Sequence, residues 1–279
     1  MALPIPALPD DHPDAKILHD IRDELLARVD GLERLEREYP VRLLEAVEFV
    51  IDPDRTGRQT IAELDKNEKT FIGTKIEHFV RDLLDIPKGI RDLRVGMHDV
   101  DIKHTIGSNW MIPPESSRVS GPCLLIGTDG KKRTCRIGLI IARPGYLTKG
   151  NRDQKGGISK EGKSHILWLL KDLSWPRDRW MGIDMKRFRE IRKLKGGSKR
   201  MAQFFRENLG KPIHRSIVQA VLFDQIDYMK RVRGNGGARD ILKVEGISVL
   251  SGTYDKPTIS KLRLPGLDPD EFMAVKTAT

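Results

Sequence analysis

Residues 98–104 read HDVDIKH, and the alternation within this stretch predicts a β-strand. Successive side chains of a strand point to opposite faces, so Asp99, Asp101 and Lys103 would share one face and the two β-branched residues between them the other. The apolar face would pack on a core. Two carboxylates and an ammonium on one face stabilise a sheet poorly, but this grouping is typical of a metal-binding site.

A carboxylate two residues before a lysine is a weak motif, and the chain has six copies of it. Only the copy at Asp101 and Lys103 lies in a convincing strand with further carboxylates upstream. Mg²⁺ prefers hard oxygen ligands, usually one or two carboxylates with water and phosphate oxygens. Asp101 and Asp92 could hold such an ion, and Glu77 could reach it from a preceding helix.

Lys103 could then orient or deprotonate an attacking water and offset charge in the transition state of phosphodiester hydrolysis. Asp99 shares its face with Asp101 and competes with Asp92 for the second carboxylate position. The alternative to a metal site is a solvated strand with ordinary ion pairs.

The charge distribution indicates a polyanionic partner. Residues 1–100 carry 15 Lys and Arg against 22 Asp and Glu, whereas residues 101–279 carry 35 against 18. A basic segment of that size fits nucleic acid better than a membrane, because no long basic amphipathic stripe or membrane-spanning run is present. A merely solvated basic surface is the alternative.

The hydropathy pattern predicts an α/β domain first. One or two amphipathic helices cover residues 16–37 and end at Pro40, and a further helix over residues 69–87 carries Glu77 beside its buried stripe. Residues 89–105 read as strand, turn and strand. Residues 123–143 read as a second hairpin around Asp129 and Gly130, and HILWLLKDL (165–173) predicts another helix.

After residue 172 the chain becomes basic and mostly helical. We expect an endonuclease-type domain over 1–172, a linker over 173–180 and a DNA-binding domain over 181–279. Short helices followed by a small hairpin over residues 246–257 indicate a winged helix-turn-helix.

Two groups of basic residues are candidate DNA contacts. The Gly-rich loop 148–163 carries Lys149, Arg152 and Lys155 and reads as a flexible arm that reaches DNA, with an ordinary solvated loop as the alternative. The C-terminal candidates flank a Gly-Asn-Gly-Gly turn and are Lys230, Arg231, Arg233 and Arg239. A further basic cluster over residues 186–195 would position phosphates.

Three segments that contain many of these residues resemble those of a known family. The chain resembles the NaeI-type type II restriction endonucleases through RTGRQTIAELDKNEKTFIGTKIEH (55–78), DLRVGMHDVDIKH (92–104) with NWMIPPE (109–115), and DYMKRVRGNGGARDILKVEGI (227–247). The resemblance implies a PD-(D/E)xK nuclease domain, with a restriction-endonuclease-like mixed sheet flanked by helices, followed by a mainly helical winged-helix, CAP-like domain.

The family motif maps onto Glu77, Asp92, Asp101 and Lys103, although Asp92 lacks the preceding proline of the superfamily name. The resemblance also implies a homodimer that cuts double-stranded DNA and a C-terminal domain able to bind a second, effector site. A symmetric dimer suits a palindromic site, because each strand then meets one active site.

The sequence therefore predicts a Mg²⁺-dependent, site-specific DNA endonuclease without a nucleotide cofactor. Two cysteines provide neither a disulfide framework nor a zinc site, and the proline- and acid-rich N-terminus is unlike a signal peptide, so we expect a cytoplasmic protein without membrane attachment. Two alternatives stay open, a winged-helix DNA-binding regulator and a nicking or modified-DNA nuclease on the same catalytic core.

Overall fold

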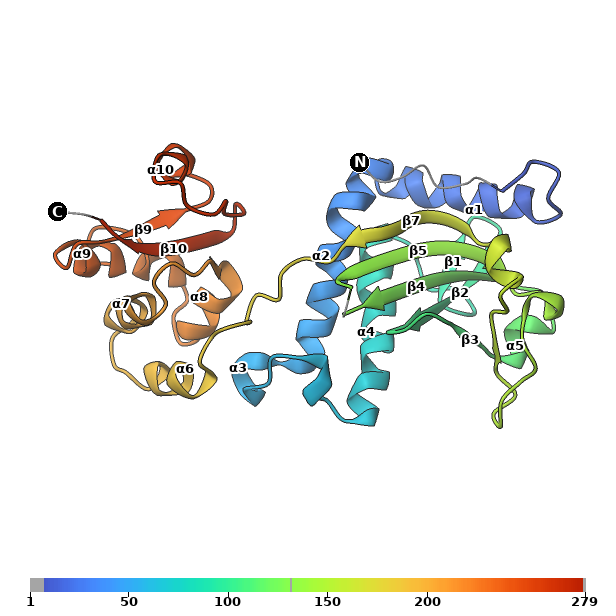
Figure 1. Ribbon diagram of the computed structural model, residues 1–279, viewed down its shortest axis with the longest axis horizontal. Coiled ribbons are helices and arrows are strands. Elements are labelled where there is room, and N and C mark those ends of the chain that lie inside the picture. The colour runs from blue at the N-terminus through green and yellow to red at the C-terminus, as the bar shows by residue number, and fades with distance from the viewer. Residues whose placement is uncertain (1–7, 131, 278–279) are drawn as a thin grey trace. The chain divides into compact units, whose positions relative to one another are not determined.

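The computed structural model describes residues 8–130 and 132–277 (Figure 1). The N-terminal residues 1–7, part of the stretch judged unlike a signal peptide, lie outside the described residues. Two compact units divide the chain: an N-terminal unit of residues up to Ile51 with Thr60–Pro176, and a C-terminal unit of Asp52–Gln59 with the chain from Arg177 onward. Within the described residues, no helix is both long enough and apolar enough to cross a membrane.

A five-stranded mixed sheet forms the centre of the N-terminal unit. Its strands lie in the order β1 (Leu93–Val95), β2 (His98–Thr105), β4 (Pro122–Asp129), β5 (Thr134–Ile141) and β7 (Leu167–Ser174). Only β2 and β4 pair in parallel, and the other neighbours are antiparallel. This confirms the mixed α/β class that the sequence predicted.

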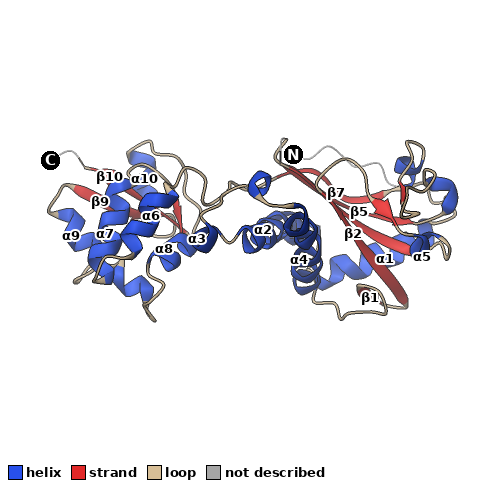
Figure 2. Cartoon of the chain, turned by 90° about the horizontal axis from the view of Figure 1, so that it is seen from below, coloured by secondary structure: helices blue, strands red, loops and turns tan. Residues whose placement is uncertain are grey.

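Three long helices cover one face of this sheet (Figure 2): α1 (Ala15–Arg28), α2 (Leu32–Ile51) and α4 (Lys66–Leu84). Their apolar stripes explain the packing, because Leu18, Ile21 and Leu25 of α1 are fully buried. Pro40 lies inside α2 and does not end it, contrary to the prediction. The helix continues to Ile51, where Asp52 takes a left-handed backbone conformation with φ 49°.

The two faces of the sheet bury different clusters. On the helix side, Val100 and Ile102 of β2 join Leu124 and Ile126 of β4 in the main core. On the other side, Trp110, with Cys123 and Leu125 of β4, packs in a smaller cluster. The predicted alternation of β2 is therefore confirmed, and its charged residues share the side of the smaller cluster.

Short elements complete the N-terminal unit. They are η1 (Ile61–Glu63) before α4, then β3 (Met111–Ile112), α5 (Pro114–Ser117), η2 (Pro144–Tyr146), β6 (Gly156–Gly157) and η3 (Gly162–His165). The strands β3 and β6 pair with each other and tie the segment after β2 to the Gly-rich loop.

The prediction of a helix over residues 165–173 is wrong, because this segment forms η3 and then β7. β7 pairs with β5 and thereby occupies the edge of the sheet. A short apolar run does not distinguish a buried strand from a buried helix by periodicity alone. Here the exposed backbone edge of β5 supplies the partner that makes the strand conformation favourable.

The C-terminal unit combines short helices with a three-stranded antiparallel sheet. The helical elements are α3 (Pro53–Thr56), α6 (Met185–Arg192), α7 (Gly197–Glu207), α8 (Arg215–Val221), η4 (Tyr228–Arg231), α9 (Ala238–Lys243) and α10 (Lys256–Lys261). The sheet has the order β8 (Ile213–His214), β10 (Glu271–Lys276) and β9 (Ile247–Ser251).

The hairpin predicted within residues 246–257 is only half correct. β9 lies there, but its partner is β10, and the intervening chain forms α10 and a loop. The carboxylate of Asp255, the residue before α10, accepts a hydrogen bond from the backbone N–H of Ser251 and so holds the start of α10 beside the end of β9. Residues 52–59 also belong to this unit, where the side-chain amide of Gln59 donates to the carbonyls of Trp180 and Ile183.

Candidate active site

The β1–β2 hairpin places Asp92 beside Asp101. The two strands join through a two-residue turn in which Gly96 adopts φ 56°, a conformation that glycine tolerates without steric cost. The register pairs Leu93 with Val100, so extending it by one residue sets Asp92 opposite Asp101. The local hairpin alone therefore brings the two carboxyl groups together.

Both carboxyl groups have well-defined hydrogen-bond partners. The backbone N–H of Ile102 donates to Asp92 Oδ2 at 2.7 Å. Lys103 Nζ lies 2.6 Å from Asp101 Oδ1, and the Ser116 hydroxyl donates to Asp101 Oδ2. Asp101 is 6% exposed, so its charge is held in a mostly desolvated position by an ammonium and a hydroxyl.

The pKa values of Asp92 and Asp101 are shifted in opposite directions. Burial, followed by a hydrogen bond with Asp101, raises the pKa of Asp92 above its usual range. Burial alone would also raise the pKa of Asp101, but hydrogen bonds from Asp92, Lys103 and Ser116 together hold it below that range. Of the two carboxyl groups, Asp92 therefore binds a proton more readily than Asp101 as the pH falls.

Glu77 adds a third carboxyl group from α4. A capping box between Asp65 and Glu68 fixes the start of this helix, and Glu77 lies beside the buried Ile76 on its inner side. Burial and then the nearby charge of Asp92 raise the pKa of Glu77 to about 7. The contribution of Lys103 is opposite in sign and smaller than these two.

The donor set fits a hard divalent cation at the Asp92–Asp101 pair. Two carboxyl groups that compete for one proton offer oxygen ligands whose charge a cation would neutralise. Within the described residues, however, no three Asp, Glu, His or Cys side chains form a group arranged to hold a metal. Glu77 thus interacts electrostatically with the pair without completing a three-ligand cluster, and Lys103 supplies the positive charge beside Asp101.

Of the residues predicted for this site, the structure brings Asp92, Asp101 and Lys103 into direct or near-direct contact. Asp99 is engaged elsewhere, since its carboxylate accepts two hydrogen bonds from the backbone N–H of Arg91. Ser116 was not predicted. It lies in α5, and an uncharged residue in a short Pro-Pro-initiated turn gives no signal that it contacts a strand.

The predicted DNA-contacting loop has a buried base and an exposed tip. At its base, β6 pairs with β3, and Asn109 Oδ1 accepts the backbone N–H of Ile158 at 3.0 Å. Lys149, Arg152 and Lys155 lie on the exposed tip, and no ion pair engages them within the described part of the chain. Their charges are available to an anion.

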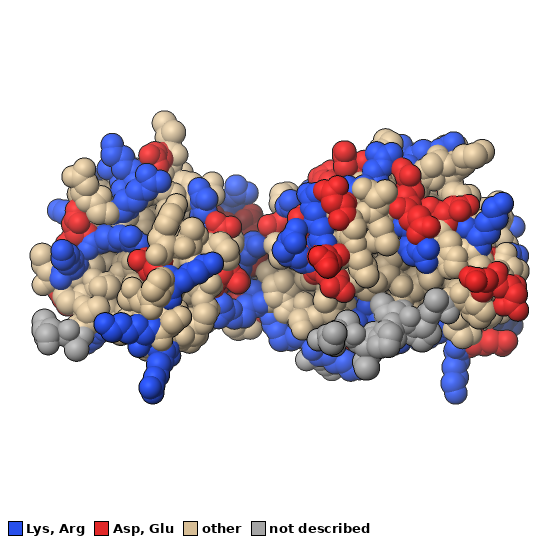
Figure 3. All heavy atoms as spheres, turned by 90° about the horizontal axis from the view of Figure 1, so that it is seen from above, with Lys and Arg blue, Asp and Glu red and all other residues tan. Residues whose placement is uncertain are grey.

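The C-terminal candidates lie on two short elements. Lys230 and Arg231 belong to η4, Arg239 belongs to α9, and Arg233 lies between these elements. Arg231 donates to Gln225 at 2.7 Å and Arg239 lies 3.4 Å from Asp255, whereas Lys230 and Arg233 are exposed. Figure 3 shows Lys and Arg side chains scattered among uncharged residues and some Asp and Glu side chains on the visible face of this unit.

A mixed sheet on which one hairpin brings together two carboxyl groups and a lysine is typical of metal-dependent nucleases. Comparison with known proteins identifies the family. A family described as restriction endonuclease NaeI matches residues 39–279. The type II restriction enzyme NaeI of Lentzea aerocolonigenes is 32% identical over 235 residues, which cover 80% of this chain and 73% of that enzyme.

This chain belongs to the NaeI restriction endonuclease family. Membership supports a type II restriction enzyme and implies DNA endonuclease activity with DNA as the substrate. Enzymes of this type generally use divalent metal ions. The family finding and the geometry of the β1–β2 hairpin are independent, because the first rests on sequence similarity and the second on strand register.

Proposed function

We propose that the protein is a Mg²⁺-dependent type II restriction endonuclease that hydrolyses both strands of duplex DNA at a short palindromic site. The observation that carries this proposal is the Asp92–Asp101 pair, with Lys103 Nζ 2.6 Å from Asp101 Oδ1, in a member of the NaeI family. Asp92 and Asp101 would hold the metal ion, with Glu77 near enough to interact electrostatically.

Bound Mg²⁺ would neutralise charge on the scissile phosphate and lower the pKa of a coordinated water. Asp92 and Asp101 would hold the ion through their carboxylate oxygens, which protons and the cation would compete to occupy. Lys103 would remain beside Asp101. Its ammonium can position the attacking water and offset the charge that develops in the transition state.

Ser116 and Glu77 assist as neighbours of this pair. The Ser116 hydroxyl holds the orientation of Asp101 by donating to the oxygen that Lys103 does not contact. Glu77, whose pKa is about 7, can accept a proton from the attacking water near neutral pH. The role of Ser116 rests on its contact with Asp101, and that of Glu77 on its burial and its electrostatic interaction with Asp92.

We also propose that the C-terminal unit is a winged-helix domain that binds duplex DNA and permits a second, effector site. From α7 onward the chain order is helix, strand, three helical elements, strand, a short helix with a loop, and strand, with the last strand between the other two. Lys230, Arg231, Arg233 and Arg239 would contact DNA from this unit, and Lys149, Arg152 and Lys155 from the N-terminal unit. A homodimer would supply one active site for each strand of a palindrome.

Plasmid cleavage tests the nuclease proposal directly. The purified protein is incubated with plasmids that carry random inserts, in Mg²⁺ or in EDTA, beside Asp101→Asn and an exposed control, Glu161→Gln. Discrete fragments that require Mg²⁺ and Asp101, with sequenced ends sharing one palindrome, would support it. Intact plasmid in Mg²⁺, with duplex binding retained in a gel shift, would favour a DNA-binding regulator instead.

A further inference from the structure

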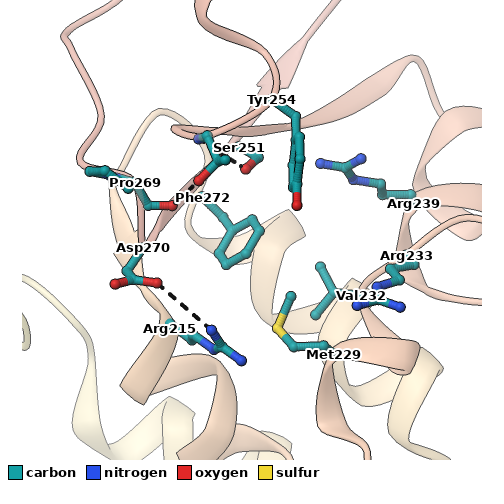
Figure 4. Close-up of a pocket in the computed structure, with 11 residues that line it drawn as sticks. Arg215, Met229, Val232, Arg233, Arg239, Ser251, Tyr254, Pro269, Asp270 and Phe272 are labelled. Atoms are coloured by element: carbon teal, nitrogen blue, oxygen red, sulfur yellow. Dashed lines mark hydrogen bonds and ion pairs between the residues drawn. The ribbon is translucent and has the colours of Figure 1, made fainter.

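A pocket of about 190 Å³ lies within the C-terminal unit, between η4 and the chain that joins β9 to β10 (Figure 4). Met229, Val232 and Phe272 give it an apolar lining, and Val232 and Phe272 are buried. Pockets for drug-sized ligands usually occupy about 300–1,000 Å³. This one therefore suits a single ring system rather than a stretch of duplex.

Three guanidinium groups surround the apolar lining, from Arg215, Arg233 and Arg239. Asp270 is the acid among the lining residues, and Arg215 lies 3.8 Å from it, a long ion pair. Arg233 is exposed and has no ion pair within the described residues. The pocket thus has an excess of positive charge, which favours an anionic ligand.

Arg239 also offers a hydrogen-bond donor that the protein does not use. Its Nε is buried and has no hydrogen-bond partner in the described part of the chain, and its contact with Asp255 is 3.4 Å long. A buried unsatisfied N–H costs free energy, so a ligand that accepts from it would gain affinity.

Tyr254 stands at the mouth of the pocket. Its side chain is 83% exposed, although it is large and aromatic, and Figure 4 shows its ring extending into the pocket beside the guanidinium of Arg239. An exposed aromatic ring next to an arginine is a stacking platform for a planar base. Asp270 adds an acceptor suited to an exocyclic amino group.

We propose that this pocket binds one nucleotide unit, with the base against Tyr254 and the apolar lining and the phosphate on the arginines. The nucleotide is either a free mononucleotide or an unpaired nucleotide of bound DNA. The proposal adds to the DNA-binding role proposed above for the C-terminal unit, and nucleotide binding can be measured without DNA cleavage.

The first arm of the test measures binding of dCMP and dAMP to the full chain by calorimetry in EDTA, with inorganic phosphate as the comparison probe. We expect saturable binding of the nucleotides that is tighter than that of phosphate. Tyr254→Ala should weaken it about ten-fold, since stacking on one aromatic ring contributes about 1–3 kcal/mol per base. Tyr254→Phe should keep the affinity, and so should Ile226→Ala, which removes a fully exposed apolar side chain outside the pocket.

The second arm compares a fully paired duplex with one that carries a single unpaired nucleotide. Tighter binding of the second duplex, lost in Tyr254→Ala, would assign the nucleotide to DNA, and nucleotide binding without this preference would assign it to a free mononucleotide. Arg233→Ala gives an independent variant at an exposed position, and circular dichroism checks that each variant is folded.

Two results would overturn the pocket proposal. One is absence of nucleotide binding and of any preference for the unpaired duplex, in a protein that still binds and cleaves paired DNA. The other is nucleotide or unpaired-duplex binding that Tyr254→Ala and Arg233→Ala leave unchanged. If nucleotides bind but duplex is neither bound nor cleaved, the pocket proposal stands and the endonuclease proposal fails.

Discussion

The carboxyl group of Glu77 should make the stability of the metal-free protein depend on pH, and Glu77→Gln should remove that dependence. Burial and the charge of Asp92 raise the pKa of this group from 4.5 to about 7. Because the folded pKa exceeds the unfolded one, Glu77 contributes stability that is complete below the unfolded pKa. That contribution is lost as pH rises through 7.

The size of the effect follows from the pKa. Each pKa unit corresponds to 1.36 kcal/mol, so the change from 4.5 to about 7 sets an upper limit of about 3 kcal/mol. Glu77 is only half-buried, and solvent screening reduces this to about 1–2 kcal/mol. Relative to the wild type, Glu77→Gln should therefore gain about 1–2 kcal/mol of unfolding free energy between pH 4.5 and pH 8.5.

Urea unfolding in EDTA measures this difference by tryptophan fluorescence, with Trp180 of the C-terminal unit replaced by Phe in both proteins so that the signal comes from the N-terminal unit. Subtracting the wild-type curve from the variant curve removes the titration of all other carboxyl groups. Glu161→Gln, at an exposed position of the same unit, controls for loss of a surface charge. Parallel wild-type and Glu77→Gln curves from pH 4.5 to 8.5 would refute the reasoning.

Four further predictions test the site, its surroundings and the fold. Lys103→Met should lower the cleavage rate by about 10²–10³ or more while duplex binding in a gel shift is kept; near-normal cleavage would remove Lys103 from the mechanism. Ser116→Ala should lower cleavage about 10–100-fold and displace its pH profile, because Asp101 loses a positioning donor; an unchanged profile would leave Ser116 a purely structural role. Replacing Lys149, Arg152 and Lys155 together by Ala should reduce the salt dependence of DNA binding, with the slope of log K against log salt falling by up to about 3; an unchanged slope would place the loop away from DNA. Arg143→Met should lower the free energy of unfolding by about 2–3 kcal/mol, because the buried carboxylate of Asp14 loses its bidentate partner; urea unfolding measures this, and a change below about 0.5 kcal/mol would contradict it.

Strand alternation made the centre of the fold predictable. In residues 98–104 one face is charged and the other β-branched, so only one register buries the apolar face. The Asp-Gly turn at residues 129–130 likewise predicted the β4–β5 hairpin, which the structure confirms. In the run at residues 165–173, apolar residues would lie on both faces of a strand and on several faces of a helix, so the pattern does not choose between the two. Pairing with the edge of β5 decides the conformation.

In the site, as in the fold, contacts between residues close in the sequence were predictable and contacts between distant residues were not. Asp92, Asp101 and Lys103 meet through a single hairpin, so a pattern confined to about a dozen residues suffices to group them. Ser116 reaches Asp101 across an intervening segment, and nothing in its own residue type marks that contact.

The basic cluster over residues 186–195 has structural contacts that its sequence does not indicate. Phosphate contacts there stay a prediction, but Arg189 and Arg192 donate to the backbone carbonyls of Arg55 and Asp54. Arg187 binds Glu190 and Glu207. These charges stabilise the C-terminal unit because residues 52–59 pack into it, a tertiary contact that sequence spacing does not encode.

The charges of the site also bear on how it would bind a cation. Burial raises the pKa of Asp92 and, to about 7, that of Glu77, whereas the Lys103 ammonium balances the charge of Asp101 at 2.6 Å. A divalent cation must displace protons to enter such a site, and its affinity should therefore rise with pH. A DNA phosphate brings one more negative charge beside Lys103, which makes cation entry more favourable when substrate is bound. Metal and DNA would then bind cooperatively, because each supplies the charge that the other requires.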